Sequence, residues 1–107
     1  MKTVPMKRIT IIGDESVRYR IVKEIHEMGA TGYTDSVVHG WGTTGVRPRQ
    51  GELANGKIEV IATPELAQRI LEHVAQHYFE NYAMIAFLDD VEVIRGETFG
   101  AKTLNKG

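Results

Sequence analysis

Two segments of the chain repeat apolar side chains at the period of an α-helix, and each lies between short runs of β-branched residues. The first segment, 15–29, is predicted to be a helix with an N-cap at Asp14 or Ser16 and a C-terminal stop at Gly29. Its apolar positions are Val17, Ile21, Ile25 and Met28. Because they are three or four residues apart, they share one face, which we expect to pack on a core.

The second segment, 63–82, carries the plainest helix signals in the chain. Thr63 suits the N-cap position, and Pro64 suits the first helical position, where its fixed φ angle fits and no backbone N–H is needed. Apolar side chains then recur every four residues, at Leu66, Ile70, Val74 and Tyr78. The pattern predicts a second amphipathic helix.

Runs of β-branched and apolar residues that end near glycine or proline predict the strands. They lie at 8–12, 32–40, 57–62 and 83–90, with a shorter extra strand at 91–96 and a C-terminal tail at 96–107. The order strand, helix, strand, loop, strand, helix, strand consists of two β-α-β units. It predicts an α+β fold, a ferredoxin-like βαββαβ sandwich with a short extra C-terminal strand. At 107 residues we expect a single domain, 1–107.

The predicted sheet is apolar on both faces. In the 83–90 strand, Met84 and Leu88 alternate with Ile85 and Phe87. Two helices on one face leave the other face uncovered, and a second copy of the same sheet is the simplest cover for an apolar face. We therefore expect a symmetric homo-oligomer.

Charge and cysteine content exclude several classes of function. Thirteen Lys and Arg against fourteen Asp and Glu give a net charge of -1, which argues against a nucleic-acid binder. The absence of cysteine excludes disulfides and thiolate metal sites and fits a reducing cytosol. The N-terminal apolar run is too short for a signal peptide or a membrane span. A soluble cytoplasmic protein without direct membrane insertion is predicted.

No motif typical of catalysis is present. The sequence lacks G-x-S-x-G, G-x-G-x-x-G and the P-loop pattern, so we do not expect an enzyme. His73 and His77 are one helical turn apart, as a pair of metal ligands would be. Without the H-E-x-x-H pattern they are interpreted as solvated side chains, and no metal site is expected.

The stretch HGWGTTGVRPRQG opens the predicted loop 40–57 and holds four glycines and the only tryptophan. Arg47, Arg49 and Lys57 outnumber Glu52, so the loop is locally positive. Glycine N–H groups and arginine forks are suited to phosphate or carboxylate ligands. The segment is either a solvated connection or an anion-binding loop. Roughly sixteen residues without regular structure favour a functional loop.

These residues resemble a known family. GATGYTDSVVHGWG is similar to the strand and loop root that precede the long T-loop of PII signalling proteins, and KIEVIATPE and VEVIRG resemble later PII strands. The matching positions at the loop root are Gly32, Thr34, Gly40, Trp41 and Gly42. The resemblance covers about residues 7–98 in the family's order, and it makes 40–57 the T-loop.

The resemblance implies a homotrimer with adenine-nucleotide sites in the clefts between subunits. The implied nucleotide-binding residues are Thr34, Gly40, Trp41, Gly42, Arg47, Glu59, Ile61, Tyr82, Arg95 and Gly96. Of these, Thr34, Glu59 and Ile61 would line the adenine side. Arg47 would contact phosphate, and Arg95 would reach the nucleotide across the cleft. Bicarbonate is implied as a co-ligand at Arg47, Arg95, Thr98 and Lys102.

Departures from the nitrogen-regulating members favour PII-like proteins of inorganic-carbon metabolism. YFENYAMI stands where those members have a phosphate loop with glycine and lysine, and Thr43 or Thr44 stands at the position of their 2-oxoglutarate-binding glutamine. The chain therefore resembles the carboxysome-associated and bicarbonate-transporter-associated subgroup. Its implied partner is a bicarbonate transporter or a carboxysome-related protein. Glu97 replaces a second phosphate-binding arginine, so ADP or AMP is expected ahead of ATP or cyclic AMP.

The resulting hypothesis is a regulatory sensor whose ligands order the loop 40–57 for partner binding. Four alternatives stay open. They are a nitrogen-type PII regulator, a trimeric ferredoxin-like divalent-metal tolerance protein, a PII-like enzyme that hydrolyses nucleotides, and an amino-acid-binding module with the same order of elements.

Overall fold

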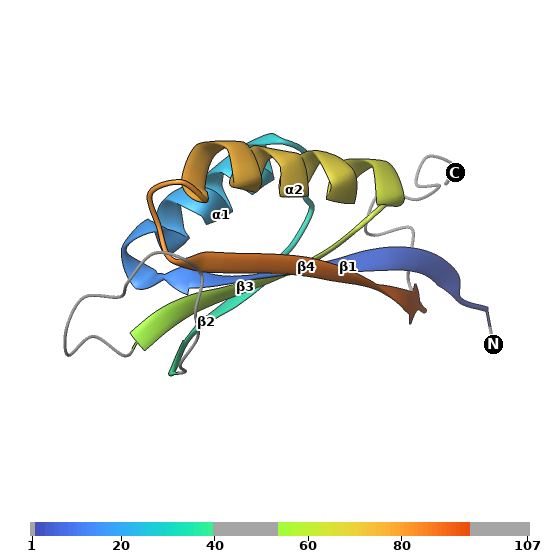
Figure 1. The fold of residues 1–107 in the computed structure, drawn as a ribbon. Helices are drawn as coiled ribbons and strands as arrows, with labels where there is room; N and C mark the ends of the chain where they lie inside the picture. The colour runs from blue at the N-terminus through green and yellow to red at the C-terminus, as the bar shows by residue number, and fades with distance from the viewer. Residues whose placement is uncertain (1, 40–53, 95–107) are drawn as a thin grey trace.

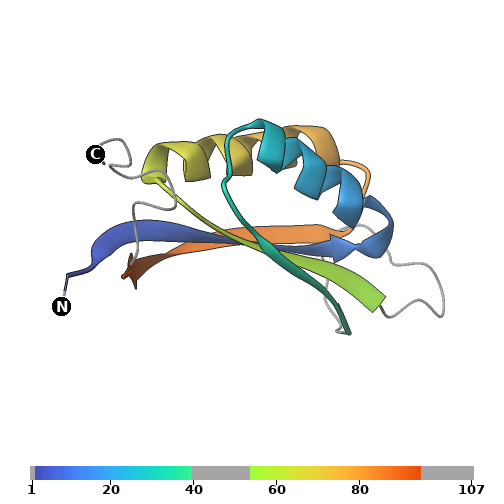
Figure 2. The same cartoon turned by 180° about the vertical axis from the view of Figure 1, so that it is seen from behind.

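The computed structural model describes residues 2–39 and 54–94. Within them the chain forms one antiparallel sheet and two α-helices (Figure 1). The elements are β1 (Val4–Asp14), the 3-10 turn η1 (Glu15–Val17), α1 (Arg18–Glu27), β2 (Thr34–His39), β3 (Ala54–Ala62), α2 (Pro64–Tyr78) and β4 (Met84–Val93). Both helices lie on the same side of the sheet, and no described helix covers the other side (Figure 2).

The order of the strands is β2-β3-β1-β4, and all neighbouring strands are antiparallel. As a result β1 and β2 are parallel to each other with β3 between them, and β3 and β4 are parallel with β1 between them. The connections through α1 and α2 therefore form two interleaved β-α-β units. This arrangement confirms the predicted ferredoxin-like α+β sandwich.

The hydrophobic core lies between the sheet and the helices. Ile9 of β1 lies opposite Val60 of β3 and Leu88 of β4, and Ile11 lies opposite Ile58 of β3 on the same face. These side chains meet the buried faces of the helices, formed by Ile21, Val22, Ile25, Ala67, Ile70 and Val74. Burial of apolar area, at about 25 cal/mol per Å², is the main source of stability here.

The start and stop of the first helical segment follow from local chemistry. Asp14 Oδ1 accepts a hydrogen bond from the Ser16 backbone N–H at 2.9 Å, and the chain first makes the 3-10 turn η1 before α1 begins at Arg18. Gly29 has a φ of 117°, a conformation that glycine adopts at low cost, and α1 ends just before it, at Glu27, with Met28 as the C-cap. The predicted helix is confirmed, with a 3-10 first turn that its periodicity did not indicate.

The second helix begins as predicted. Thr63 Oγ1 accepts a hydrogen bond from the backbone N–H of Leu66 at 3.3 Å, and Pro64 occupies the first helical position. The buried positions are Ala67, Ile70, Val74 and Tyr78. Leu66, which the four-residue repeat placed on the buried face, is only half-buried, because the centre of that face is shifted toward Ala67.

The strand β4 is continuous, whereas the sequence predicted two strands with a boundary after Asp90. Asp89 lies opposite Arg8 of β1, and Arg8 Nη2 lies 2.9 Å from Asp89 Oδ2. Opposite charges on facing positions stabilise antiparallel strands. The strand therefore continues through Asp89 and Asp90, and β4 ends at Val93, within the predicted extra strand 91–96. The same pairing lengthens β1 beyond the predicted 8–12.

The strand β3 begins at Ala54, so the connection after β2 is shorter than the predicted 40–57. Gly56 lies opposite Val37 of β2 and opposite Gly13 of β1. With a partner strand on each side, the backbone N–H and C=O groups of this segment are hydrogen-bonded in the sheet. Sequence patterns missed this extension because Asn and Gly have low strand propensity.

Neither described helix is both long enough and apolar enough to cross a membrane.

Candidate functional site

A row of side chains crosses the sheet on the side away from the helices. Thr34 of β2 lies opposite Glu59 of β3, Glu59 lies opposite Thr10 of β1, and Thr10 lies opposite Phe87 of β4. Directly opposed residues of antiparallel strands share a face. The neighbours of Thr10 along β1 are in the core, so this row projects to the other side. That side is termed the open face below.

Three side chains of β3 follow one another along the open face: Lys57, Glu59 and Ile61, here named the β3 strip. Lys57 Nζ lies 3.7 Å from Glu59 Oε2. Thr34 adds a hydroxyl beside Glu59. A carboxylate, a hydroxyl and an apolar side chain together can bind a ligand with a flat base and polar edges. The structure thus brings together Thr34, Glu59 and Ile61, the residues expected on the adenine side.

Tyr82, another residue of the predicted nucleotide set, lies with the helices instead. Its ring centroid is 5.9 Å from that of Tyr78, and Arg20 Nη2 donates a hydrogen bond to its hydroxyl at 3.3 Å. The hydrogen bonds with Tyr78 and Tyr82 raise the pKa of the Arg20 guanidinium. Within one chain, Tyr82 is therefore not brought together with Thr34 and Glu59.

The other predicted site residues lie outside the described residues. They are Gly40, Trp41, Gly42, Arg47, Arg95, Gly96, Thr98 and Lys102. The loop cation Arg49 lies outside them as well.

Beside the β3 strip the open face is apolar. Ile85 and Phe87 of β4 are 49% and 46% exposed, although both are large hydrophobic side chains. Ile12 of β1 lies opposite Ile85 and opposite Lys57, which joins this patch to the β3 strip. Exposed apolar side chains that lie together are typical of an interface. The predicted apolar second face is therefore present along β4 at Ile85 and Phe87. Along β3 the same face is polar, because Lys57 and Glu59 lie on it.

A polar network between the helices centres on Glu24 of α1. Its Oε1 accepts a hydrogen bond from the Tyr78 hydroxyl at 2.7 Å and lies 2.8 Å from His73 Nε2. Burial by itself would raise the pKa of the Glu24 carboxyl, but the hydrogen bonds with His73 and Tyr78 outweigh burial and lower that pKa. Burial and the contact with Glu24 raise the pKa of the Tyr78 hydroxyl.

The two helix histidines have other partners than a metal ion. His73 contacts Glu24, and His77 Nδ1 lies 2.9 Å from the carbonyl oxygen of His73. In the part of the chain that the structure describes, no three His, Cys, Asp or Glu side chains converge as ligands of one ion would. The interpretation of both histidines as solvated is therefore wrong for His73, which is partly buried against Glu24, whereas His77 is exposed.

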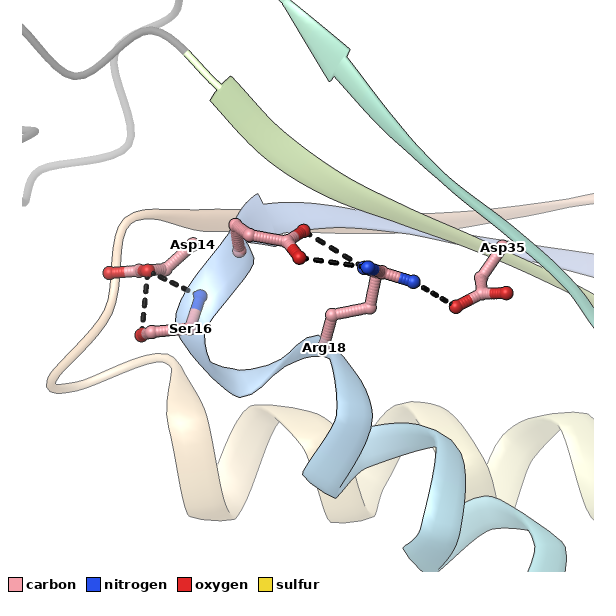
Figure 3. A network of polar contacts seen from close by, with 5 residues as sticks. Asp14, Ser16, Arg18 and Asp35 are labelled. Atoms are coloured by element: carbon pink, nitrogen blue, oxygen red, sulfur yellow. Dashed lines mark hydrogen bonds and ion pairs between the residues drawn. The ribbon is translucent and has the colours of Figure 1, made fainter.

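A second polar network lies at the start of α1 (Figure 3). Arg18 Nε and Nη2 each donate a hydrogen bond at 2.8 Å to the Glu15 carboxylate, and Arg18 Nη1 donates a hydrogen bond to Asp35 of β2. Sequence patterns did not predict this network. The only local signal was the spacing of three residues between Glu15 and Arg18, because Asp35 is 17 residues further along the chain.

The fold and the open face define the class of protein: a small ferredoxin-like α+β subunit with polar side chains beside an exposed apolar patch. The family model of nitrogen regulatory protein P-II matches residues 6–98. The chain therefore belongs to this family of PII-like signalling proteins, as the resemblance of its sequence indicated.

Solved structures of PII-like proteins are similar to the chain over most of its length. A PII-like signalling protein of Thermus thermophilus is 38% identical, with a TM-score of 0.79, and the match covers 92% of this chain and 99% of that one. CPII of Thiomonas intermedia K12, bound to ADP, AMP and acetate, is 25% identical, with a TM-score of 0.81. The match covers 92% of this chain and 98% of CPII. CPII bound to ADP and bicarbonate is 26% identical, with a TM-score of 0.77 and coverages of 92% and 97%.

Proposed function

We propose that the protein is a homotrimeric sensor of adenine nucleotides that regulates inorganic-carbon (bicarbonate) metabolism. The observation that carries the proposal is the placement of Thr34, Glu59 and Ile61 together on the open face, next to an exposed apolar patch. The described part of one subunit supplies one wall of a binding site. A second subunit seated on Ile85 and Phe87 would supply the opposite wall.

ADP or AMP is the proposed nucleotide. CPII, which is 25% identical, was solved with both ADP and AMP. In this chain the Glu59 carboxylate would accept hydrogen bonds from the adenine amino group or a ribose hydroxyl, and Ile61 would pack on the base. Arg47 and Arg95 are proposed to contact phosphate, since an arginine fork matches phosphate oxygens.

Bicarbonate is the proposed second ligand, because CPII was also solved with ADP and bicarbonate. The ion has the planar shape and the charge of a carboxylate, which guanidinium and backbone N–H groups recognise. The proposed residues are Arg47, Arg95, Thr98 and Lys102. Ligand-dependent ordering of the segment between β2 and β3 would then control binding to a bicarbonate transporter or a carboxysome-related protein.

Calorimetric titration with AMP, ADP, ATP and cyclic AMP, each with and without bicarbonate, tests the proposal. We expect ADP or AMP to bind most tightly, and bicarbonate to increase the affinity. Arg47→Ala should raise the Kd for ADP about tenfold, because it removes a charged phosphate contact. Arg69→Ala, at an exposed position of α2, is the matched control. If no adenine nucleotide binds at millimolar concentration, the proposal is wrong.

A nitrogen-type PII regulator is the alternative function, since the matching family model is that of nitrogen regulatory protein P-II. Such a protein would bind 2-oxoglutarate together with a nucleotide. The same titrations with 2-oxoglutarate in place of bicarbonate separate the two proposals. If 2-oxoglutarate increases the nucleotide affinity and bicarbonate does not, the result favours the nitrogen-type regulator.

A further inference from the structure

We propose that Arg18 is a positioning residue of the nucleotide site. It crosses β3 to Asp35 and thereby holds the edge strand β2 so that Thr34 stays opposite Glu59. The inference rests on the proposed function, because it assigns Arg18 a part in the same site.

The strand β2 depends on such a tether. It has six residues, and β3 is its only partner strand among the described elements. Thr34 and Asp35 are its first two residues, and consecutive strand residues project to opposite faces. Asp35 lies opposite Ile58 on the helix side, whereas Thr34 lies opposite Glu59 on the open face. A contact that fixes Asp35 therefore fixes the backbone that carries the Thr34 hydroxyl.

Arg18 reaches β2 over a glycine of β3. A Cβ atom at Gly56 would lie 2.8 Å from Arg18 Cδ and 2.9 Å from Arg18 Cβ, which is too close for real atoms. Gly56 lies between Gly13 of β1 and Val37 of β2 in the sheet. The bare backbone at this point leaves the space in which the Arg18 side chain lies as it extends from α1 to Asp35 (Figure 3).

The guanidinium is held from both sides. Its two hydrogen bonds to Glu15, the first residue of η1, fix its plane, and Nη1 is then directed at Asp35. The hydrogen bonds with Glu15 and Asp35 raise the pKa of Arg18, and the hydrogen bond with Arg18 lowers the pKa of Glu15. A lysine would keep the charge, but its ammonium group lacks the planar fork that serves two carboxylates at once.

The test is the affinity for ADP, measured by calorimetry on wild type, Asp35→Asn and Arg18→Lys. Both substitutions should raise the Kd for ADP about fivefold or more, because β2 loses its tether. Glu24→Gln is the matched control. Glu24 also lies on α1, but its carboxylate contacts His73 and Tyr78 of α2 and does not contact β2. Glu24→Gln should keep the Kd within about twofold of wild type. Equal affinity of Asp35→Asn and wild type would overturn the inference.

A double-mutant cycle with Thr34→Val separates positioning from a general loss of stability. If Asp35 acts through Thr34, then Asp35→Asn should add little to the loss of affinity that Thr34→Val causes. Fully additive losses would show that Asp35 affects binding by another route, and the inference would be wrong.

Hydrogen–deuterium exchange of residues 34–39 gives a readout that needs no ligand. When the two variants are compared under conditions that give them the same free energy of unfolding, exchange of β2 should be faster in Asp35→Asn than in Glu24→Gln. Equal exchange rates would show that Asp35 does not hold β2 in place. If wild type binds no adenine nucleotide but exchange of β2 is faster in Asp35→Asn, the proposed function is wrong, whereas the contact of Arg18 with Asp35 still holds β2 in place. If wild type binds ADP and Asp35→Asn binds it equally well, the positioning role alone fails.

Discussion

Thr34 and Glu59 lie directly opposite each other in the ladder of β2 and β3, on the sheet face that the helices leave uncovered. In such a pair the Cβ atoms are about 5 Å apart, so one ligand group can contact both side chains. The segment between the two strands separates them in sequence, and only the pairing of β2 with β3 brings them together.

Glu59→Gln is expected to raise the Kd for ADP about tenfold without unfolding the protein. A hydrogen bond to a charged group contributes about 1.5–3 kcal/mol, and the amide keeps the shape of the side chain while it loses the charge. Calorimetry measures the effect. Glu27→Gln is the control, because Glu27 is exposed on α1 and 3.7 Å from Lys23. Unchanged ADP affinity in Glu59→Gln would place the nucleotide elsewhere.

Phe87→Glu is expected to convert the proposed trimer to monomers. Phe87 is 46% exposed in the single chain, and a carboxylate there would have to be desolvated in a subunit interface. Light scattering coupled to size-exclusion chromatography measures the mass, and circular dichroism checks the fold. Tyr19→Glu, at a position of α1 that is 80% exposed, should leave the mass unchanged. A Phe87→Glu protein with the mass of wild type would exclude the open face as the interface.

Tyr78→Phe is expected to lower the free energy of unfolding by about 1–2 kcal/mol. The substitution removes the 2.7 Å hydrogen bond to Glu24, whose carboxylate is partly buried between the helices. Urea unfolding measures the loss. Tyr19→Phe removes a hydroxyl from an exposed tyrosine and should change stability by less than about 0.5 kcal/mol. An equally small effect of Tyr78→Phe would mean that the hydrogen bond between Tyr78 and Glu24 adds nothing to stability.

The Glu24 network also predicts a dependence of stability on pH. Because the pKa of Glu24 is lowered in the folded protein, the unfolded chain binds the proton more readily. The contribution of Glu24 is therefore complete above its ordinary pKa of about 4.3, and it is lost as the pH falls toward the folded-state value. At pH 7 the free energy of unfolding should therefore be larger for wild type than for Glu24→Gln. The difference between the two proteins should become smaller below about pH 4.3.

Urea unfolding of both proteins at several pH values measures this difference. Glu15, whose pKa is also lowered, is present in wild type and in the variant, so its contribution cancels. A difference that stays constant from neutral to acidic pH would contradict the assignment of the network to Glu24.

The helices were predictable because their signals are local. Thr63 caps a helix that Pro64 begins, and Gly29 ends the other helix in a conformation that other residues avoid. The alternation of Ile85 and Phe87 with Met84, Ala86 and Leu88, which pack on the core, also indicated an exposed apolar patch on β4. Each of these features depends on residues within one or two turns, or on the period of one strand.

The limits of the strands could not be predicted in this way. Asp89 continues β4 because it meets Arg8, which is 81 residues away in the sequence. Ala54 begins β3 because β1 and β2 extend far enough to pair with the residues that follow it. Propensity and turn signals describe only the neighbours of a residue, whereas these pairings depend on the register of the complete sheet.

Local sequence patterns predicted the order of elements and the exposed apolar side chains of β4. The resemblance to PII proteins added the expectation that Thr34, Glu59 and Ile61 act together. The three-dimensional arrangement was needed to learn that these three residues share the open face, that Tyr82 lies with the helices, and that Arg18 reaches Asp35 over Gly56. Local chemistry selects helices and strands, whereas contacts between distant residues exist only once the register of the sheet and the packing of α1 on it are set.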